Sequence, residues 1–163
     1  MNAHTQRAPS QSPAAATLAG WALLTMDGVR LALPQKDIVT IGLVAALLPA
    51  QDAVNAIGCF VHNGERWLVY CLDRCFVPVP MLATTARVCV LVRVQERIFG
   101  LVGTQVVLLA SNADLEVQPL PACLVQSGSP LAGLALHNDG IVLSVHASLL
   151  ADYLDLKRNT TDD

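Results

Sequence analysis

The sequence predicts an all-β fold of two small barrels that share a hydrophobic seam, followed by one short helix. Repeated hairpin turns, scarce helical periodicity and an apolar composition support this prediction. Of the 163 residues, 53% are hydrophobic and 14% are charged, whereas an ordinary domain has about 25% charged residues. A chain of this length suits one domain with a sizeable core. Its apolar character indicates a large core or a surface partly covered by partners.

Four pairs of β-rich segments are each separated by a short turn. Asp27-Gly28 and Asn63-Gly64 are strong two-residue hairpin signals, because these residues tolerate positive φ. Asn138-Asp139-Gly140 predicts a three-residue turn, and Gln95-Glu96 predicts a turn without glycine. The predicted strand pairs are 23–26 with 29–33, 59–62 with 65–72, 88–94 with 97–102, and 134–137 with 141–145. Short strands punctuated in this way are typical of a barrel or sandwich.

The remaining segments predict two strands, over 106–109 and 115–117, and little helix. Val44 to Leu48 could form a short helical piece that ends before Pro49. His146 to Leu154 is the best helical candidate, because its larger apolar residues have the spacing of an amphipathic face. These residues are Leu149, Leu150, Tyr153 and Leu154. Such a helix usually plugs the end or groove of a β structure.

The domain is expected to cover residues 19–156. Residues 1–18 are rich in Ser, Gln, Pro and Ala and predict a disordered tail, and residues 157–163 predict a flexible polar end. The strands fall into two groups on either side of Pro78 to Thr85. We therefore expect each barrel to be built from one of these groups.

Charge and hydropathy argue against two classes of partner. The net charge is −3, and the two lysines, Lys36 and Lys157, belong to no basic cluster. Nucleic-acid and anionic-lipid binding both need such a cluster. The longest apolar run, Ile41 to Ala50, is too short for a spanning helix of about 20 residues. We therefore expect no nucleic-acid partner and no direct membrane insertion.

The five cysteines are an odd number and lie among apolar neighbours. A secreted disulfide scaffold would have an even number, so buried thiols in a reducing cytoplasm are expected. Cys71 and Cys75 form a Cys-x3-Cys in which Arg74 could lower a thiol pKa. If residues 71–75 are extended, both cysteines point to the same face. A cysteine-dependent redox regulator therefore stays open as an alternative function.

Known catalytic motifs do not occur in the sequence. It has no glycine-rich phosphate loop, no Gly-x-Ser-x-Gly and no His-Glu-x-x-His. His62, His137 and His146 are isolated, and the first two flank hairpin turns, where an imidazole is expected to face water. We expect no enzyme activity, metal or cofactor. A small-molecule-binding β-barrel is a third alternative, although 4% aromatic residues counts mildly against a ligand cavity.

Four blocks follow one another in an informative order. Trp21 to Ile41 is a strand, a tight turn and a second strand, and Gly58 to Leu72 is a glycine, an apolar stretch, a turn and a strand. Ile98 to Val106 begins with Ile-Phe-Gly-Leu-Val, and Leu131 to Ser144 is a closing hairpin before the helix. In this order and these motifs, Trp21 to Leu154 resembles the CheW family, the coupling proteins of bacterial chemosensory arrays.

The resemblance implies a CheW-like fold of two small SH3-like β-barrel subdomains with a short C-terminal helix. It also implies a non-catalytic adaptor that couples a chemoreceptor-type sensor to a CheA-type histidine kinase. In that family one barrel docks on the kinase, and the groove between the barrels holds a receptor helix tip. Other CheW-like proteins are further expected partners.

The candidate partner-binding residues come from two segments. Ile38, together with Thr40, falls where the family contacts its receptor, although Ile38 could be an ordinary buried strand residue. The second segment is a turn that contains Trp and Arg, types enriched at interface hot spots. It comprises Asn63, Gly64, Glu65, Arg66 and Trp67. In the alternative interpretation, Trp67 fills the core while Glu65 and Arg66 cap the turn.

Several polar positions of the family are replaced in this chain. The arginine of the family's Arg-Gly turn is Asn63, and the acidic residue late in the second strand is Thr40. The family's aspartates are replaced by Cys71, Gly103 and Val145. These departures suggest a divergent relative that serves another assembly. Candidates are a chemosensory-like system controlling type IV pili or twitching, and a non-motility pathway.

Overall fold

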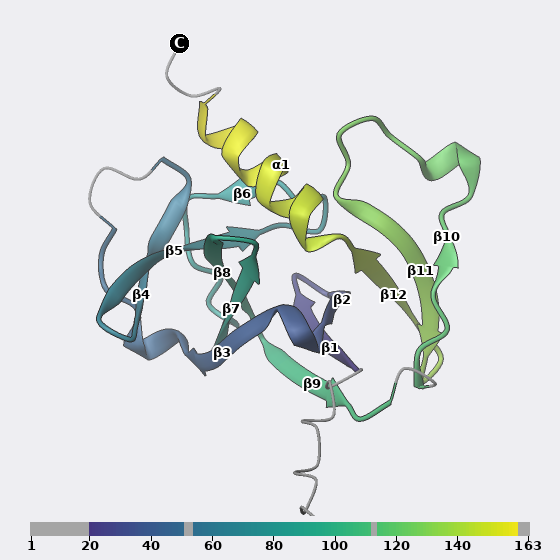
Figure 1. The fold of residues 1–163 in the computed structure, drawn as a ribbon, viewed down its shortest axis with the longest axis horizontal. Helices are drawn as coiled ribbons and strands as arrows, with labels where there is room; N and C mark the ends of the chain where they lie inside the picture. Colours follow the sequence, from purple (N-terminus) through teal and green to yellow (C-terminus); the bar gives the residue numbers. More distant parts are fainter. Residues whose placement is uncertain (1–19, 51–53, 112–113, 160–163) are drawn as a thin grey trace, which may run out of the picture.

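The computed structural model describes residues 20–50, 54–111 and 114–159 (Figure 1). The predicted tail over residues 1–18 lies outside these ranges. The strands are β1 (Trp21–Met26), β2 (Val29–Pro34), β3 (Ile38–Leu43), β4 (Ala56–His62), β5 (Glu65–Leu72), β6 (Pro78–Val79), β7 (Val88–Val94), β8 (Arg97–Gly103), β9 (Gln105–Leu109), β10 (Gln118–Pro119), β11 (Leu131–His137) and β12 (Gly140–Val145). The described ranges also contain the α-helix α1 (Ala147–Asn159) and short 3-10 turns such as η1 (Gln35–Asp37) and η2 (Val44–Ala46).

All four predicted hairpins are confirmed: β1–β2, β4–β5, β7–β8 and β11–β12 are antiparallel neighbours. The predicted three-residue turn of the last hairpin is wrong. Asn138 and Asp139 both adopt positive φ, 49° and 59°, so they form a two-residue turn that matches the twist of the strands. Gly140 is consequently the first residue of β12 and pairs with His137.

The strands form two curled sheets. The terminal subdomain is the sheet β10-β11-β12-β2-β1-β9, and the middle subdomain is the sheet β3-β7-β8-β5-β4. The expectation that each barrel comes from one half of the chain is therefore wrong. The terminal subdomain takes strands from both ends of the chain. The middle subdomain, β3 to β8, is inserted between them in the sequence. Each sheet contains one parallel pair, β12 with β2 and β5 with β8, which hairpin signals cannot reveal.

The curled sheet of the middle subdomain closes where the chain that follows β3 meets β4. A bridge joins Leu48 to Cys59, with main-chain hydrogen bonds of 2.9 and 2.8 Å in both directions. The ring of Phe60 lies over Gly42, where a Cβ atom would be 2.4 Å from Phe60 Cζ. A side chain at position 42 would therefore push these two strands apart.

The chain passes between the subdomains twice, from β2 through η1 to β3 and from β8 to β9, and the second crossing is the tighter one. β8 ends at Gly103 and β9 begins two residues later, so a nearly continuous strand passes from the middle sheet into the terminal sheet. A Cβ atom on Gly103 would lie 2.4 Å from the carbonyl oxygen of Thr25 and 2.6 Å from Leu24 Cδ1. The main-chain N–H of Thr104 donates to that same carbonyl at 2.8 Å. The crossing therefore requires the smallest residue.

The buried apolar residues of the described part of the chain form three clusters. Leu23 and Val142 belong to the small interior of the terminal subdomain, and Val69 and Leu91 to the interior of the middle one. The third and largest cluster lies between the sheets and beneath α1, and we call it the seam. It contains Leu24, Met26, Leu31, Leu33, Tyr70, Leu72, Phe76, Val90, Val92, Val94, Phe99, Leu101, Val145, Ala147, Leu150, Ala151 and Leu154. The predicted shared seam is thus confirmed.

Helix α1 covers one side of the seam (Figure 1). It begins one residue after His146 and runs to Asn159, past the predicted domain end at residue 156. The predicted apolar face is partly wrong. Ala147, Leu150, Ala151 and Leu154 are buried, whereas Leu149 is exposed and Tyr153 is half-buried. The small alanines let the helix approach the sheets closely, so its buried face is narrower than leucine spacing suggests.

A fork of ion pairs ties the helix to the β7–β8 hairpin. Arg97 donates from Nη2 to Asp152 Oδ1 and from Nη1 to Asp155 Oδ2, both at 2.8 Å. These hydrogen bonds raise the pKa of the Arg97 guanidinium. All three side chains are exposed, so the fork orients the helix more than it stabilises it.

The predicted strand over 115–117 is wrong. Leu115 is buried in the interior of the terminal subdomain, with Val117 packed against the same cluster. The chain regains strand pairing only at β10. Two prolines, Pro119 and Pro121, follow this stretch and limit the number of main-chain donors for a ladder.

Candidate partner-binding surface

The exposed margin of the seam is the strongest candidate surface. Strand register places Leu43 of β3 opposite Val88 of β7, and Val88 opposite Gly103 of β8. Since directly opposite residues share a face of the sheet, Leu43 lies on the face that packs on the seam. Ile41 lies on the same face, opposite the fully buried Val90. At β3 the seam layer thus reaches solvent, where Leu43 is 64% exposed.

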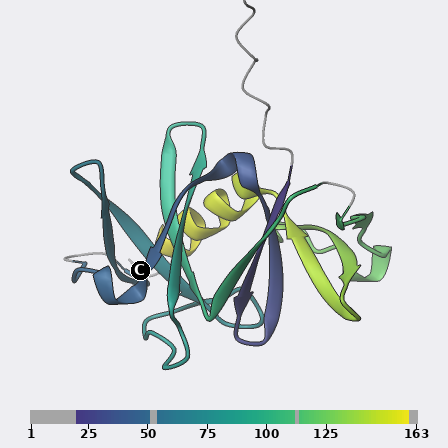
Figure 2. The ribbon, with the colours of Figure 1, turned by 90° about the horizontal axis from the view of Figure 1, so that it is seen from below.

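Strand β9 forms the other side of this margin. Val106 packs against the seam cluster and pairs with Leu24, a member of that cluster. Leu108 lies two residues further on and therefore points to the same face, and it is 57% exposed. We call the set Ile38, Ile41, Leu43, Val88, Val106 and Leu108 the seam face. The strands β3 and β9, which carry five of its six residues, can be followed in Figure 2, which shows the molecule from below.

The two candidates on β3 are placed differently by the structure. Ile38 is half-buried and packs against the seam, so it belongs to the seam face. A bulge separates it from Thr40, which pairs with Leu91 of the middle interior. Thr40 is half-buried, on the interior side of the barrel wall. Only the first of these residues is therefore positioned to touch a partner at the seam.

The turn candidates also separate into two groups. Asn63, Gly64, Glu65 and Arg66 are exposed at the β4–β5 hairpin. Trp67 is half-buried and packs against the interior cluster of the middle subdomain, opposite Phe60. This placement agrees with the alternative in which Trp67 fills the core.

Arg66 and Trp67 also line a cleft of about 380 Å³ between the β4–β5 hairpin, the β7–β8 hairpin and α1. The opposite walls include Glu96, Arg97 and Asp155. Sequence reasoning did not identify these three residues, because only the folded chain brings the helix beside the two hairpins. The cleft is a second, mixed-charge surface, distinct from the apolar seam face.

Exposed leucines of the seam face were also missing from the sequence prediction. Val106 to Leu109 is an uninterrupted apolar run in a short strand, a pattern that also fits a strand buried on both faces. The structure instead makes β9 the last strand of its sheet order, with Leu108 exposed. An apolar run therefore predicted the strand correctly and gave no signal of its exposure.

The five cysteines are free, and three of them, Cys59, Cys71 and Cys89, are buried. Burial raises the pKa of the Cys89 thiol to about 12, so this thiol stays protonated and unreactive. Residues 73–77 are not extended but form a turn, in which Asp73 Oδ1 accepts hydrogen bonds from the main-chain N–H groups of Cys75 and Val77 at 2.8 and 2.9 Å. Cys71 is therefore buried while Cys75 is exposed.

Thiol accessibility gives a direct test of this arrangement. At neutral pH, we expect Ellman's reagent to titrate two thiols of the folded protein quickly, Cys75 and Cys123, because these side chains are exposed. The three buried thiols should react only after unfolding in guanidinium chloride. The double variant Cys75→Ser/Cys123→Ser is the control and should show no fast phase. A third fast thiol in the folded wild type would contradict the burial pattern.

The three histidines that the structure describes lie in no metal site. Within the described ranges, no group of three or more His, Cys, Asp or Glu side chains could hold a metal ion. The expectation that His137 simply faces water is wrong, because its Nδ1 is buried and has no hydrogen-bond partner. Its carbonyl accepts a hydrogen bond from Arg30 Nη2 at 2.9 Å.

Within residues 20–50, 54–111 and 114–159, no helix is long and apolar enough to cross a bilayer.

Comparisons with known proteins identify the fold. No family model matches the sequence, and no curated protein matches it. Among solved structures, the chain is similar to the scaffolding protein TtCheW from Thermoanaerobacter tengcongensis, with a TM-score of 0.60 and 14% sequence identity. The match covers 81% of this chain and 91% of that one. The protein therefore has a CheW-like fold of two β subdomains and a C-terminal helix.

Proposed function

We propose that the protein is a non-catalytic cytoplasmic adaptor that couples a chemoreceptor-type sensor to a CheA-type histidine kinase. The observation that carries this proposal is the seam face, where apolar side chains from both subdomains reach solvent at one margin. The likeness in fold between this chain and a scaffolding protein supports the same role. The replaced polar positions favour a divergent assembly, in chemotaxis or in type IV pilus control.

The seam face suits the apolar tip of a receptor helix pair. Its members lie on β3, β7 and β9 and share the seam side of their sheets, so their side chains form an apolar strip that a helix can cover with residues spaced three and four apart. Leu43 and Leu108 are the most exposed members, and burying them on binding is favourable by about 25 cal/mol for each Å² removed from water. The receptor therefore binds here through apolar contact rather than through salt bridges.

The β4–β5 hairpin is the surface proposed for the kinase. Asn63, Gly64, Glu65 and Arg66 are exposed on the middle subdomain, and Arg66 lines the mixed-charge cleft beside α1. A regulatory domain of the same fold, in the kinase or in another CheW-like protein, docks against this end. The charged rim sets the orientation of the complex, and its contribution weakens as salt is raised.

Substitution of the seam face by charge tests the receptor contact. We expect Leu43→Asp and Leu108→Asp each to lower the affinity for a purified receptor signalling fragment by about tenfold or more, since a buried apolar contact becomes a buried unpaired charge. The affinity is measured by biolayer interferometry with the receptor fragment immobilised. The matched control is Leu136→Asp, which changes a leucine that is 72% exposed on the β11–β12 hairpin and should bind like wild type.

Equal losses in all three variants would contradict the assignment of the seam face. For the kinase arm, Arg66→Glu should weaken capture of the CheA-type kinase from purified components while leaving receptor binding unchanged. If the folded wild-type protein binds neither the receptor fragment nor the kinase, the coupling function is wrong and only the fold assignment stands.

A further inference from the structure

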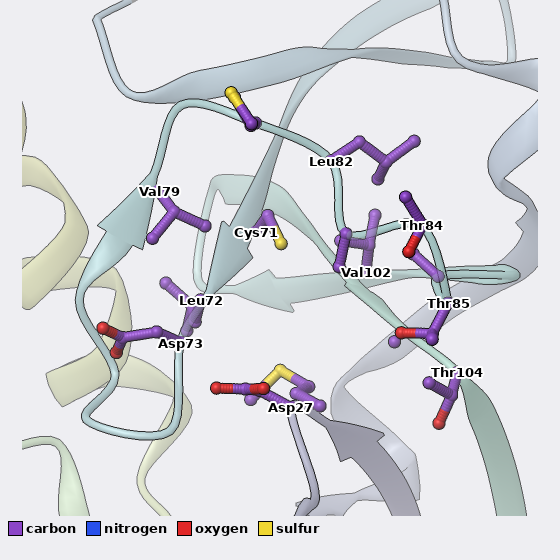
Figure 3. Close-up of a pocket in the computed structure, with 15 residues that line it drawn as sticks. Asp27, Cys71, Leu72, Asp73, Val79, Leu82, Thr84, Thr85, Val102 and Thr104 are labelled. Carbon is purple, nitrogen blue, oxygen red and sulfur yellow. The ribbon is translucent and has the colours of Figure 1, made fainter.

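A cleft of about 410 Å³ opens where the two subdomains meet (Figure 3). Met26 and Asp27, at the β1–β2 turn, come from the terminal subdomain. Leu72, at the end of β5, and Val102, on β8, come from the middle one. The segment 81–86 forms a further wall. The volume lies within the range of about 300 to 1,000 Å³ of small-molecule sites in proteins.

The residues that line this cleft are mostly apolar, and those that carry a charge are acidic. Its base is apolar, with Val79, Leu82 and Val102 grouped around the Cys71 thiol (Figure 3). Thr84 and Thr85 add hydroxyl groups at one side. The lining residues include no lysine, arginine or histidine, and the two aspartates are its only side chains charged at neutral pH. The cleft therefore disfavours a carboxylate or phosphate and favours a neutral or cationic molecule.

The carboxylate of Asp27 is the group best placed to favour a cationic molecule over a neutral one. Asp73 is committed to its own turn, where Oδ1 accepts two main-chain hydrogen bonds. Asp27 Oδ2 accepts one main-chain hydrogen bond, from the N–H of Arg74 at 3.1 Å. The Arg74 guanidinium lies 3.8 Å away, with 77% of its side chain exposed. An exposed pair of this kind is weak, so a bound cation can replace the arginine beside Asp27.

We propose that this cleft binds a small apolar molecule carrying one positive charge, such as a short-chain alkylamine. The alkyl part lies among Val79, Leu82 and Val102, and the ammonium group lies beside Asp27. Both subdomains contribute to the cleft, so the ligand holds them together and raises the stability of the folded chain by mass action. No seam-face residue lines this cleft, and the proposal does not depend on the adaptor role.

Three six-carbon probes that differ only in their head groups test the proposal. The full-length protein is titrated with n-hexylamine, n-hexanol and hexanoate, and binding is followed by thermal shift and by isothermal calorimetry. We expect hexylamine to bind about fivefold more tightly than hexanol, as for a partly exposed ion pair, and hexanoate to show no binding. Equal binding of all three probes, or binding of none, would overturn the proposal.

Substitutions then locate the site. Asp27→Asn keeps the hairpin turn, because asparagine also tolerates positive φ there, and should abolish the preference for hexylamine over hexanol. The matched control is Asp139→Asn, which removes the same charge from the turn of the β11–β12 hairpin, where Asp139 has a φ of 59°. This control should keep the full preference. Loss of the preference in both variants would show a general charge effect and overturn the site.

A blocking variant separates the cleft from binding elsewhere on the surface. Thr85 is exposed and lines the cleft, so Thr85→Trp should fill the space without disturbing the core, and its fold is checked by circular dichroism. We expect Thr85→Trp to lose binding of both hexylamine and hexanol. Unchanged hexylamine binding by this folded variant would place the amine outside the cleft and refute the proposal.

Discussion

Leu150→Ala is expected to lower the free energy of unfolding by about 3 kcal/mol, because it removes a fully buried leucine from the helix that covers the seam. Leu150 is 0% exposed and packs among residues of both sheets. The lost methyl groups leave a cavity that the surrounding strands can fill only in part. Urea unfolding followed by circular dichroism measures the change.

The neighbouring Leu149 provides a matched control. It is 44% exposed on the same helix, so Leu149→Ala makes the same chemical change with the same effect on helix propensity. Its cost should stay within about 0.5 kcal/mol of zero, as for a surface substitution. Similar losses for the two variants would mean that α1 does not pack on the seam in this orientation.

Gly103→Ala should also destabilise the protein strongly, by about 2 to 3 kcal/mol, the cost of overpacking a tight site. The new methyl group would meet the carbonyl oxygen of Thr25, which is main chain and cannot rotate away. The strand crossing must therefore shift, and with it the hydrogen bond from Thr104 to the same oxygen. Urea unfolding gives the size of the loss.

Gly128→Ala is the comparison for this second variant. Gly128 has a φ of +77°, and a methyl group added there would have nothing within 4 Å, so its substitution costs only backbone strain, about 1 kcal/mol. The excess loss at position 103 measures the steric requirement of the crossing. An equal or smaller loss at Gly103 than at Gly128 would show that the crossing can relax around a methyl group.

Local features of the fold could be predicted because their signals are local. The four hairpins depend on pairs of adjacent residues in tight turns, such as Asn63 with Gly64 and Asn138 with Asp139, which adopt positive φ. The strand β7 is predictable because its residues are almost all apolar and buried. Leucine spacing predicts the helix, although alanines complete its buried face.

The division into subdomains could not be predicted, because it rests on pairs of strands far apart in sequence. The pairing of β12 with β2 and of β5 with β8 is parallel, and no turn motif indicates a parallel neighbour. The candidate site shows the same limit. The exposure of Leu43 and Leu108 depends on which strands end each sheet, and Trp67 packs on the middle interior because the register of β5 turns it inward.

The insertion of one subdomain within the other has a consequence for the order of folding. The strands β1 and β2 must pair with β9 and β12, and the whole middle subdomain separates them along the chain. Closing so long a loop of unfolded chain costs entropy. The strands β3, β7 and β8 are closer to one another in sequence, and their pairing places Leu43 and Gly103 on one row across the sheet. We expect the middle subdomain to form first and, once folded, to bring the two ends of the chain close together. Truncation at either terminus should then slow or abolish formation of the terminal sheet while the earlier folding phase persists.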